Sequence, residues 1–247
     1  MNSLFETTNE FTAYETEHLL LLLGFLIFGY FFFRVLGSRT ETEQQKILLG
    51  FALLLSATQL LKVPVNLYLG TFDVEKDIPL HLCNFLPFIL VWVFATGSRK
   101  VWGTLFFWIV LGVSQANLTP SVDFSLFHYD AIRYWLVHMG LVLLALYPAV
   151  GWKWDLRRGD LLRTVGWLNV AAGIIYGINL LLGSNYMYVM AKPPGTTFFS
   201  LLPPWPTYIL VLEVILVVWS VMVYLLFRWV RAKIRDPQVS PMEESRV

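Results

Sequence analysis

The chain has 247 residues and a formal net charge of +1; 57% of its residues are hydrophobic and only 14% are charged. A soluble domain carries roughly 25% charged residues, so this composition excludes a disordered chain, a nucleic-acid-binding domain and an ordinary cytosolic enzyme. There is one cysteine, Cys83, which excludes an internal disulfide and a metal site built from several cysteines.

Seven hydrophobic segments are long enough to cross a bilayer, which takes about 20 apolar residues in a helix. They predict an all-α polytopic membrane bundle of seven transmembrane helices. The predicted spans are residues 18–36, 46–69, 79–97, 101–118, 131–150, 163–183 and 207–230. The chain is thereby divided into an extracytoplasmic N-terminal segment (1–17), a seven-helix transmembrane domain (18–230) and a cytoplasmic tail (231–247).

The Lys and Arg residues alternate between the two sides of the predicted bundle. Only Lys62, Lys76, Arg133 and Lys192 lie on one side. The other 14 of the 18 lie on the opposite side: Arg34, Arg39, Lys46, Arg99, Lys100, Lys153, Arg157, Arg158, Arg163, Arg228, Arg231, Lys233, Arg235 and Arg246. Because cytoplasmic connections are enriched in Lys and Arg, we expect the N-terminus outside the cell and the C-terminus in the cytoplasm.

Polar side chains lie near the outer ends of six of the seven predicted spans. Such side chains are costly in a bilayer and usually face a cavity or the interior of a bundle. They are Gln59, Lys62, Asn66, His81, Cys83, Asn84, Gln115, Asn117, Asp130, Arg133, Tyr134, His138, Asn179, Asn185 and Glu213. Their shared depth predicts one polar pocket in the outer half of the membrane. The alternative is that they are helix caps and interfacial residues.

Cys83 and His138 are the first candidate pair for chemistry. A thiolate beside an imidazole base is a nucleophile suited to acyl transfer, and the two residues lie on different spans at a similar depth. His81 is two residues from Cys83 and therefore lies on nearly the opposite helical face, which makes it the weaker partner. The alternative interpretation is that Cys83 is a small packing residue.

Four charged residues form a second constellation: Lys62, Asp130, Arg133 and Glu213. Buried charges in a bilayer are expected to pair. They therefore form either an interhelical salt bridge or a site for a lipid head group, with a cation on phosphate or carboxylate. We expect no metal and no cofactor, because the spans carry no HExxH-type ligand pair and no phosphate-binding loop.

Three stretches resemble a known family. They are PLHLCNFLPF (79–88), FHYDAIRYWLVHMGLVLLALY (127–147) and INLLLGSNYMYVMAKPPGTTFFSLLPPWPTYIL (178–210). Their order and content resemble the YwaF-type family of bacterial integral membrane proteins, which is similar in turn to the eukaryotic transmembrane protein 164 group. The resemblance covers nearly all of residues 15–230.

The resemblance implies a function and a location. The eukaryotic relatives are implicated in acyl transfer onto lysophospholipids, with a membrane cysteine and a histidine as the reactive pair. On that pattern Cys83 matches the cysteine and His138 matches the histidine. The resemblance also implies a multi-pass protein of the cell membrane, in bacteria the cytoplasmic membrane, with membrane lipids as its partners.

The first functional hypothesis is a membrane lipid acyltransferase or hydrolase. Cys83 would attack the ester of a phospholipid or acyl-lipid substrate, and His138, oriented by Tyr134 or Asp130, would take the thiol proton. An asparagine amide would donate hydrogen bonds to the oxyanion and a cation would hold the phosphate. The predicted substrate-binding residues are Lys62, His81, Asn84, Arg133, Tyr134, Asn185 and Glu213.

The second hypothesis is a non-enzymatic protein that transports or binds lipids or small molecules. Seven spans with a pocket open to the outside also fit this class. Transport normally needs a route on the cytoplasmic side as well. The inner halves of most spans are apolar, which disfavours a path for ions or sugars.

Overall fold

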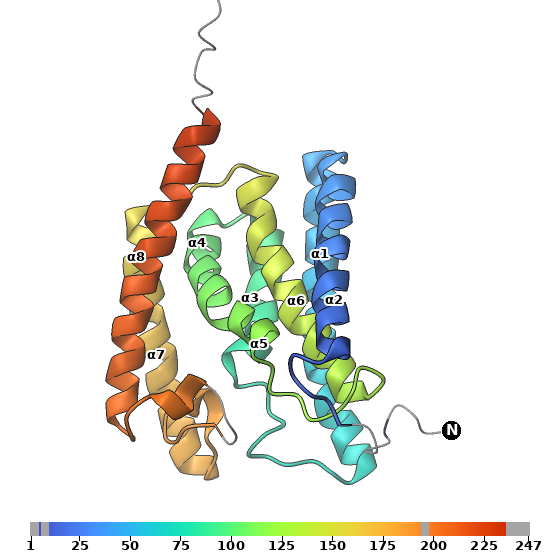
Figure 1. Cartoon of the computed structure of the whole chain (residues 1–247), viewed down its shortest axis with the longest axis vertical. Helices are drawn as coiled ribbons and strands as arrows, with labels where there is room; N and C mark the ends of the chain where they lie inside the picture. Colours follow the sequence, from blue (N-terminus) through green and yellow to red (C-terminus); the bar gives the residue numbers. More distant parts are fainter. Residues whose placement is uncertain (1–4, 6–9, 194–197, 236–247) are drawn as a thin grey trace, which may run out of the picture.

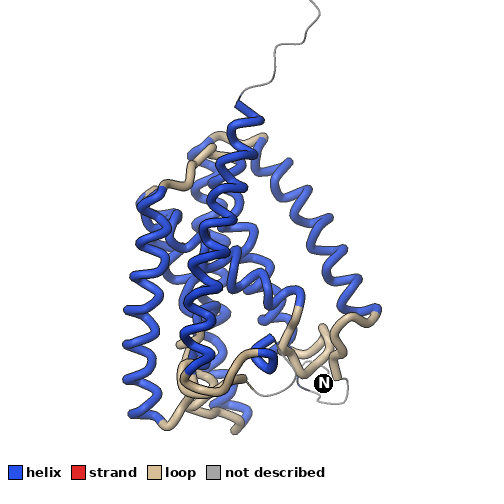
Figure 2. Tube along the Cα trace, turned by 60° about the vertical axis from the view of Figure 1, so that its left-hand side comes forward, coloured by secondary structure: helices blue, strands red, loops and turns tan. Residues whose placement is uncertain are grey.

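The computed structural model describes residue 5 and residues 10–193 and 198–235. Long helices run between two ends of the molecule where the connections gather (Figures 1 and 2). The elements are α1 (Thr16–Gly37), α2 (Glu41–Leu69), α3 (Leu82–Thr96), α4 (Arg99–Phe107), η2 (Trp108–Val113), α5 (Ser114–Leu118), α6 (Tyr129–Val150), α7 (Arg158–Leu182), η3 (Tyr186–Tyr188), η4 (Phe198–Leu201) and α8 (Thr207–Arg235). Among the described residues β-pairing is limited to one isolated bridge, Glu10 to Phe124, which confirms the all-α prediction.

Within the described residues, six helices are long and apolar enough to cross a membrane. One of them is the continuous segment 99–118, in which a π-helical stretch, η2, joins α4 to α5. The seventh member of the bundle is α3, a shorter apolar helix of 15 residues. The sequence predicted this span at 79–97, but the helix begins only at Leu82, after an extended N-cap at His81.

The ends of several helices follow from local sequence signals. Thr40 and Glu43 form a capping box at the start of α2, in which each side chain bonds the backbone N–H of the other. Gly70, Gly97 and Gly183 follow α2, α3 and α7 with φ between 66° and 70°. This left-handed conformation strongly favours glycine, so the position of each glycine in the sequence determines where its helix ends.

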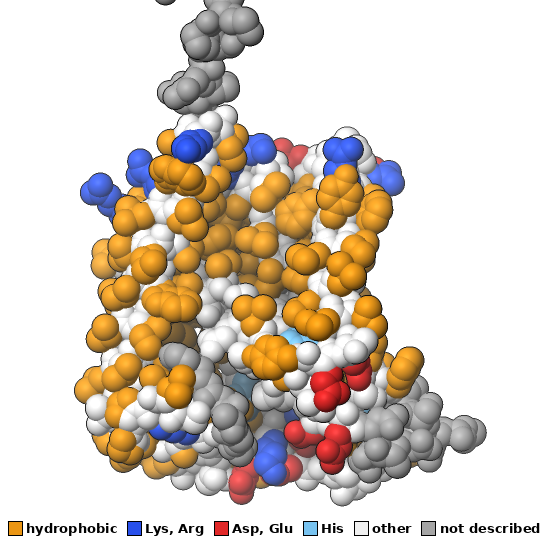
Figure 3. All heavy atoms as spheres, in the orientation of Figure 1, with side chains coloured by type: hydrophobic (Ala, Val, Ile, Leu, Met, Phe, Trp, Pro, Cys, Tyr) orange, Lys and Arg blue, Asp and Glu red, His pale blue; other side chains and the backbone are white. Residues whose placement is uncertain are grey.

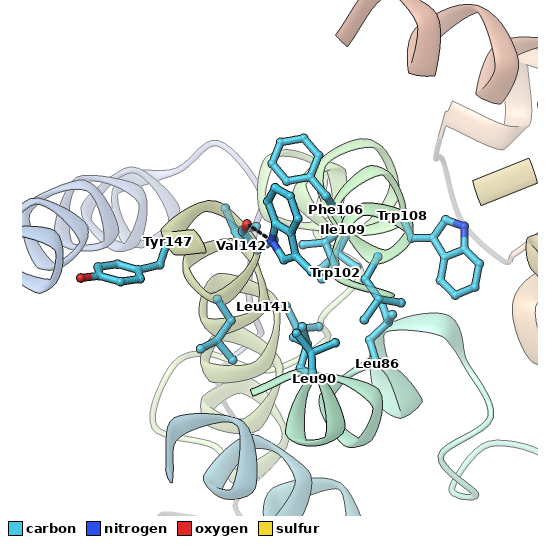
Figure 4. Close-up of a cluster of buried hydrophobic side chains, with 14 of the residues drawn as sticks. Leu86, Leu90, Trp102, Phe106, Trp108, Ile109, Leu141, Val142 and Tyr147 are labelled. Carbon is cyan, nitrogen blue, oxygen red and sulfur yellow. Dashed lines mark hydrogen bonds between the residues drawn. The ribbon is translucent and has the colours of Figure 1, made fainter. Parts of the chain in front are cut away.

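The α7–α8 pair lies on one side of the bundle and α1 and α2 on the other, with α3 to α6 between them (Figure 1). The central packing is apolar. Trp102 is fully buried and its Nε1 donates to the Ala145 carbonyl at 2.9 Å, among Leu90, Ile109 and Leu141 (Figure 4). Apolar and aromatic side chains therefore make up the centre of the packing between α3, α4 and α6.

The two ends of the molecule differ in charge (Figure 3). Most Lys and Arg side chains gather where α8 ends, which we call the basic end, and most Asp and Glu side chains gather at the other, which we call the acidic end. Asp160 is fully buried at the basic end, where it accepts bonds from Arg99 at 2.8 and 2.9 Å, from Arg163, and from the backbone N–H of Arg157 at 2.7 Å. This network joins α4 to α7.

Candidate functional site

The single cysteine lies in the first turn of α3. His81 is the N-cap of this helix and Cys83 is its second residue. The first backbone N–H groups of a helix lack intrahelical partners and bind negative charge. The Cys83 Sγ donates to Asn84 Oδ1 at 3.5 Å. A reaction at Cys83 that develops negative charge would therefore meet backbone N–H donors.

The shortness of α3 sets the depth of Cys83. A 15-residue helix rises about 22 Å, which is about 8 Å less than the hydrocarbon core of a bilayer. The C-terminal end of α3 turns directly into α4 at the basic end, so the missing length falls at the acidic end, beside Cys83. Irregular backbone is tolerated at that depth only when it is buried in protein or lines a cavity.

His138 lies on α6 with its imidazole buried. Its Nδ1 is 2.8 Å from the Tyr134 carbonyl oxygen. Because a carbonyl oxygen only accepts, Nδ1 carries the proton and Nε2 holds the lone pair. The ring lies against the Tyr134 ring, with centroids 4.0 Å apart, and the Tyr134 hydroxyl donates to the Ala116 carbonyl at 2.7 Å. His138 is held in the tautomer that a general base requires.

Cys83 and His138 lie on two helices that pack against each other, α3 and α6. Cys83 is in the first turn of α3, and His138 is in the third turn of α6, one turn after Tyr134. The ring contact between Tyr134 and His138 fixes the imidazole on its own helix.

Arg133 keeps unused donor capacity. Its Nη1 donates to Gln59 Oε1 at 3.2 Å and its Nη2 to Asp130 Oδ1 at 3.3 Å, both longer than a strong charge-assisted bond. In the described part of the chain, its buried Nε has no hydrogen-bond partner. Among the polar residues of α2, α3 and α6, the Arg133 guanidinium is therefore the cation that is best able to bind an anionic ligand.

Lys62 forms a buried ion pair with Asp77, a residue of the α2–α3 connection that the sequence argument did not single out. The Lys62 Nζ lies 2.8 Å from Asp77 Oδ1, and Asp77 Oδ2 accepts from the Asp73 backbone N–H at 2.8 Å. Burial raises the pKa of the Asp77 carboxyl, but hydrogen bonds from Lys62, Asp73 and Asn66 outweigh burial and hold it below its ordinary 3.8. Lys62 therefore anchors the connection to α2.

His81 is held by the connection between α7 and α8. Its Nδ1 accepts from the Met187 backbone N–H at 3.2 Å, and its ring packs against Tyr186 and Tyr188 with centroids 5.2 and 5.1 Å away. The Tyr186 hydroxyl also donates to the Val74 carbonyl at 2.6 Å. The α7–α8 connection therefore covers the start of α3 and binds the α2–α3 connection.

Two other predicted substrate-binding residues have partners elsewhere. The Asn185 Nδ2 donates to the Ala191 carbonyl at 2.8 Å, and its Oδ1 accepts from the backbone N–H groups of Met190 and Ala191, both at 3.1 Å. Its amide thus holds a turn of the α7–α8 connection. Glu213 accepts from Asn169 Nδ2 at 2.8 Å, a bond between α8 and α7 rather than to the cluster on α2, α3 and α6.

His18 is a buried polar residue that the sequence argument passed over. Its Nδ1 accepts from the Tyr14 backbone N–H at 3.0 Å, so its Nε2 donates to the Asn117 carbonyl at 2.9 Å. A lone histidine at the start of an apolar span was the available signal. No group of three or more His, Cys, Asp or Glu side chains in the described ranges is placed to hold a metal ion.

A family model of the TMEM164 family matches residues 13–224, from just before α1 to within α8. The chain belongs to the TMEM164 family. The matched range contains α3 and α6, and it confirms the resemblance to the transmembrane protein 164 group. Membership of the TMEM164 family and the six apolar helices identify a multi-pass membrane protein. No curated protein and no solved structure matches the chain.

Proposed function

We propose that this protein transfers or hydrolyses acyl groups of membrane lipids, with Cys83 as nucleophile and His138 as general base. The observation that supports the proposal is the packing of α3, which carries Cys83, against α6, which carries His138. The hydrogen bond at His138 Nδ1 leaves Nε2 available as a base. The resemblance to the transmembrane protein 164 group implies the same pair.

In the first half-reaction, His138 Nε2 takes the Cys83 proton and the sulfur attacks the carbonyl carbon of a phospholipid ester. The carbonyl oxygen becomes an oxyanion, which accepts hydrogen bonds from backbone N–H groups at the start of α3 and from the Asn84 amide. When the ester C–O bond breaks, His138 returns the proton to the leaving oxygen. A lysophospholipid departs and an acyl thioester remains on Cys83.

In the second half-reaction, the hydroxyl of an acceptor attacks the thioester carbonyl. His138 removes the proton of that hydroxyl and returns it to the sulfur as the C–S bond breaks, which restores the thiol. A lysophospholipid acceptor makes the protein an acyltransferase, and water makes it a hydrolase. The depth of Cys83 below the membrane surface favours a lipid acceptor over water.

The phosphate of the substrate is assigned to Arg133 rather than to Lys62. The Lys62 ammonium is already paired with Asp77 at 2.8 Å. The Arg133 guanidinium makes two long bonds and keeps a buried Nε without a partner among the described residues. A guanidinium also matches the geometry of a phosphate better than an ammonium does.

We infer that the acidic end faces the outside of the cell, so that the site draws its substrate from the outer leaflet. The concentration of Lys and Arg at the basic end supports this orientation (Figure 3). It puts the N-terminus outside and the C-terminus in the cytoplasm. The proposed location is the cell membrane, in bacteria the cytoplasmic membrane.

The test is transfer of a labelled acyl chain from a phospholipid to a lysophospholipid by the purified protein in mixed micelles. Cys83→Ala should abolish transfer. His138→Asn retains a donor for the Tyr134 carbonyl but lacks the base, so transfer should fall about 10²–10⁴-fold. Glu213→Gln, which keeps an acceptor for Asn169, is the control and should match the wild type.

The covalent step is tested on the same variants. A thiol-reactive lipid probe should label the wild type at Cys83, and labelling should fall sharply in His138→Asn. Equal labelling of the two proteins would rule out His138 as the base that activates Cys83. Undiminished acyl transfer by a folded Cys83→Ala protein would rule out Cys83 as the nucleophile.

A further inference from the structure

A groove of about 790 Å³ lies between α1, α2 and α6. Its lining is apolar along most of its length, with Leu20 and Phe28 from α1, Phe51 from α2, and Leu136 and Met139 from α6. The lining includes neither Cys83 nor His138. The groove is therefore separate from the polar cluster on which the proposed function rests.

The helix α1 is attached to the bundle at its start and again near its middle. At its start, the His18 imidazole bonds the Asn117 carbonyl, and Glu17 Oε1 accepts from the Leu126 backbone N–H. Farther along, a Cβ added at Gly29 would lie only 3.3 Å from the Leu143 side chain, so the helices touch there. Between these two contacts, α1 contributes Leu20, Leu21, Gly24, Phe25 and Phe28 to the lining of the groove.

The dimensions of the groove suit an extended hydrocarbon chain. Its lining on α1 extends from Glu17 to Phe32, which corresponds to about 22 Å along the helix axis, more than half of a hydrocarbon core about 30 Å thick. An apolar groove of this size does not hold ordered water. Inside a bilayer, a groove of this length and polarity matches an acyl chain that lies along α1.

Glu17 is the charged residue of the lining, and it lies at the acidic end of the groove. Its Oε1 accepts one backbone bond, and a carboxylate has capacity for further donors. Glu15 lies two residues before it, at the start of α1. A carboxylate at this rim attracts an ammonium and repels a head group that carries only negative charge.

We propose that this groove is a second lipid site, which holds one acyl chain of a membrane lipid with the ammonium of its head group at Glu17. The chemical class is a zwitterionic phospholipid with an amine or quaternary ammonium. The site is independent of the Cys83–His138 chemistry, because its lining lies on another face of α6 than His138.

Native mass spectrometry of the full chain in detergent tests the site, with phosphatidylethanolamine and phosphatidylglycerol of identical chains as probes. The wild type should bind one phosphatidylethanolamine more tightly than phosphatidylglycerol. Gly24 lines the groove, and an added Cβ there meets no atom within 4 Å. Gly24→Phe should therefore fill the groove and weaken this binding about tenfold. Gly173→Phe on α7, where an added Cβ also meets no atom within 4 Å, is the matched control and should bind as the wild type does.

Glu17→Gln tests the head group separately. The glutamine keeps an oxygen for the Leu126 N–H, so α1 should stay attached, while the preference for phosphatidylethanolamine should fall about threefold. A Gly24→Phe protein that binds lipid as the wild type does would overturn the site. An unchanged preference in Glu17→Gln would overturn the head-group assignment. Acyl transfer by Gly24→Phe should equal that of the wild type, which separates this site from the proposed function.

Discussion

Replacing Lys62 with Met distinguishes a structural anchor from a phosphate-binding residue. The Lys62 and Asp77 side chains are 13% and 7% exposed and their charged atoms lie 2.8 Å apart. Removing one partner of a buried ion pair costs about 3–5 kcal/mol. Asp77 keeps its bond from the Asp73 N–H, so we expect a loss near the lower limit, about 3 kcal/mol. In a chain of this size that corresponds to about 6–12 °C in the melting temperature.

The assay is thermal unfolding of the purified protein in detergent, followed by acyl transfer at a temperature where every variant is folded. Lys62→Met/Asp77→Leu should recover most of the lost stability, because it leaves no buried charge without a partner, and it should still transfer acyl groups. Lys76→Met is the matched control. Its ion pair with Asp73 is largely exposed, so its stability should change by less than about 1 kcal/mol.

Two results would refute this reasoning. If Lys62→Met melted at the wild-type temperature, the ion pair would not anchor the α2–α3 connection. If the double variant were as stable as the wild type but inactive in transfer, Lys62 would contact the substrate, as one of the sequence hypotheses held.

Three further predictions concern pH, the basic end and Tyr134. The Asp77 carboxyl has a lowered pKa in the folded state. Its contribution to the stability of the fold is therefore fully present above about pH 4 and is lost as the pH falls through the folded-state pKa. The melting temperatures of the wild type and Asp77→Asn should converge in acid, and a constant difference between them would contradict this. Asp160→Asn should cost about 3 kcal/mol, because it leaves the largely buried Arg99 guanidinium without its charged partner. The control Asp155→Asn, at a side chain 40% exposed, should cost less than about 1 kcal/mol. Equal losses in thermal unfolding would argue against the buried network. Tyr134→Phe keeps the ring against His138 but loses the bond to the Ala116 carbonyl, so stability should fall by about 1 kcal/mol and transfer less than tenfold; complete loss of transfer would mean that the hydroxyl takes part in the reaction.

The membrane spans were accessible from the sequence because hydrophobicity is a local property that sums along the chain. The predicted segment 101–118 corresponds to the helical stretch 99–118, and the predicted 131–150 corresponds to α6, Tyr129–Val150. The main difference is α3. Residues 79–81 adjoin the apolar run in the sequence, but their backbone belongs to the connection that Asp77 and Tyr186 hold in place.

The membership of the candidate site was predictable in part. Polar residues of α2, α3 and α6 do gather at the acidic end, as their common depth indicated, and His138 lies beside Tyr134 because the two are one helical turn apart. Glu213 has the same apparent depth in the sequence, yet it bonds Asn169 on the α7–α8 side. Depth along a helix says how far a residue lies from the membrane surface, and it does not say toward which neighbour the helix turns that residue.

Partner choice depended on the assembled chain. By its depth in the predicted span, Lys62 could have paired with Asp130 or Glu213. Instead, the connection between α2 and α3 brings Asp77 Oδ1 to 2.8 Å from Lys62 Nζ. The proton on His138 Nδ1 likewise follows from an atom on another helical turn. The same holds for Arg133 Nε, which has no hydrogen-bond partner among the described residues. Hydrogen bonds and ion pairs require distances near 3 Å, and such distances depend on the tilt and rotation of whole helices. Apolar residues that follow one another are enough to specify a span, whereas a reactive site exists only once separate helices have packed.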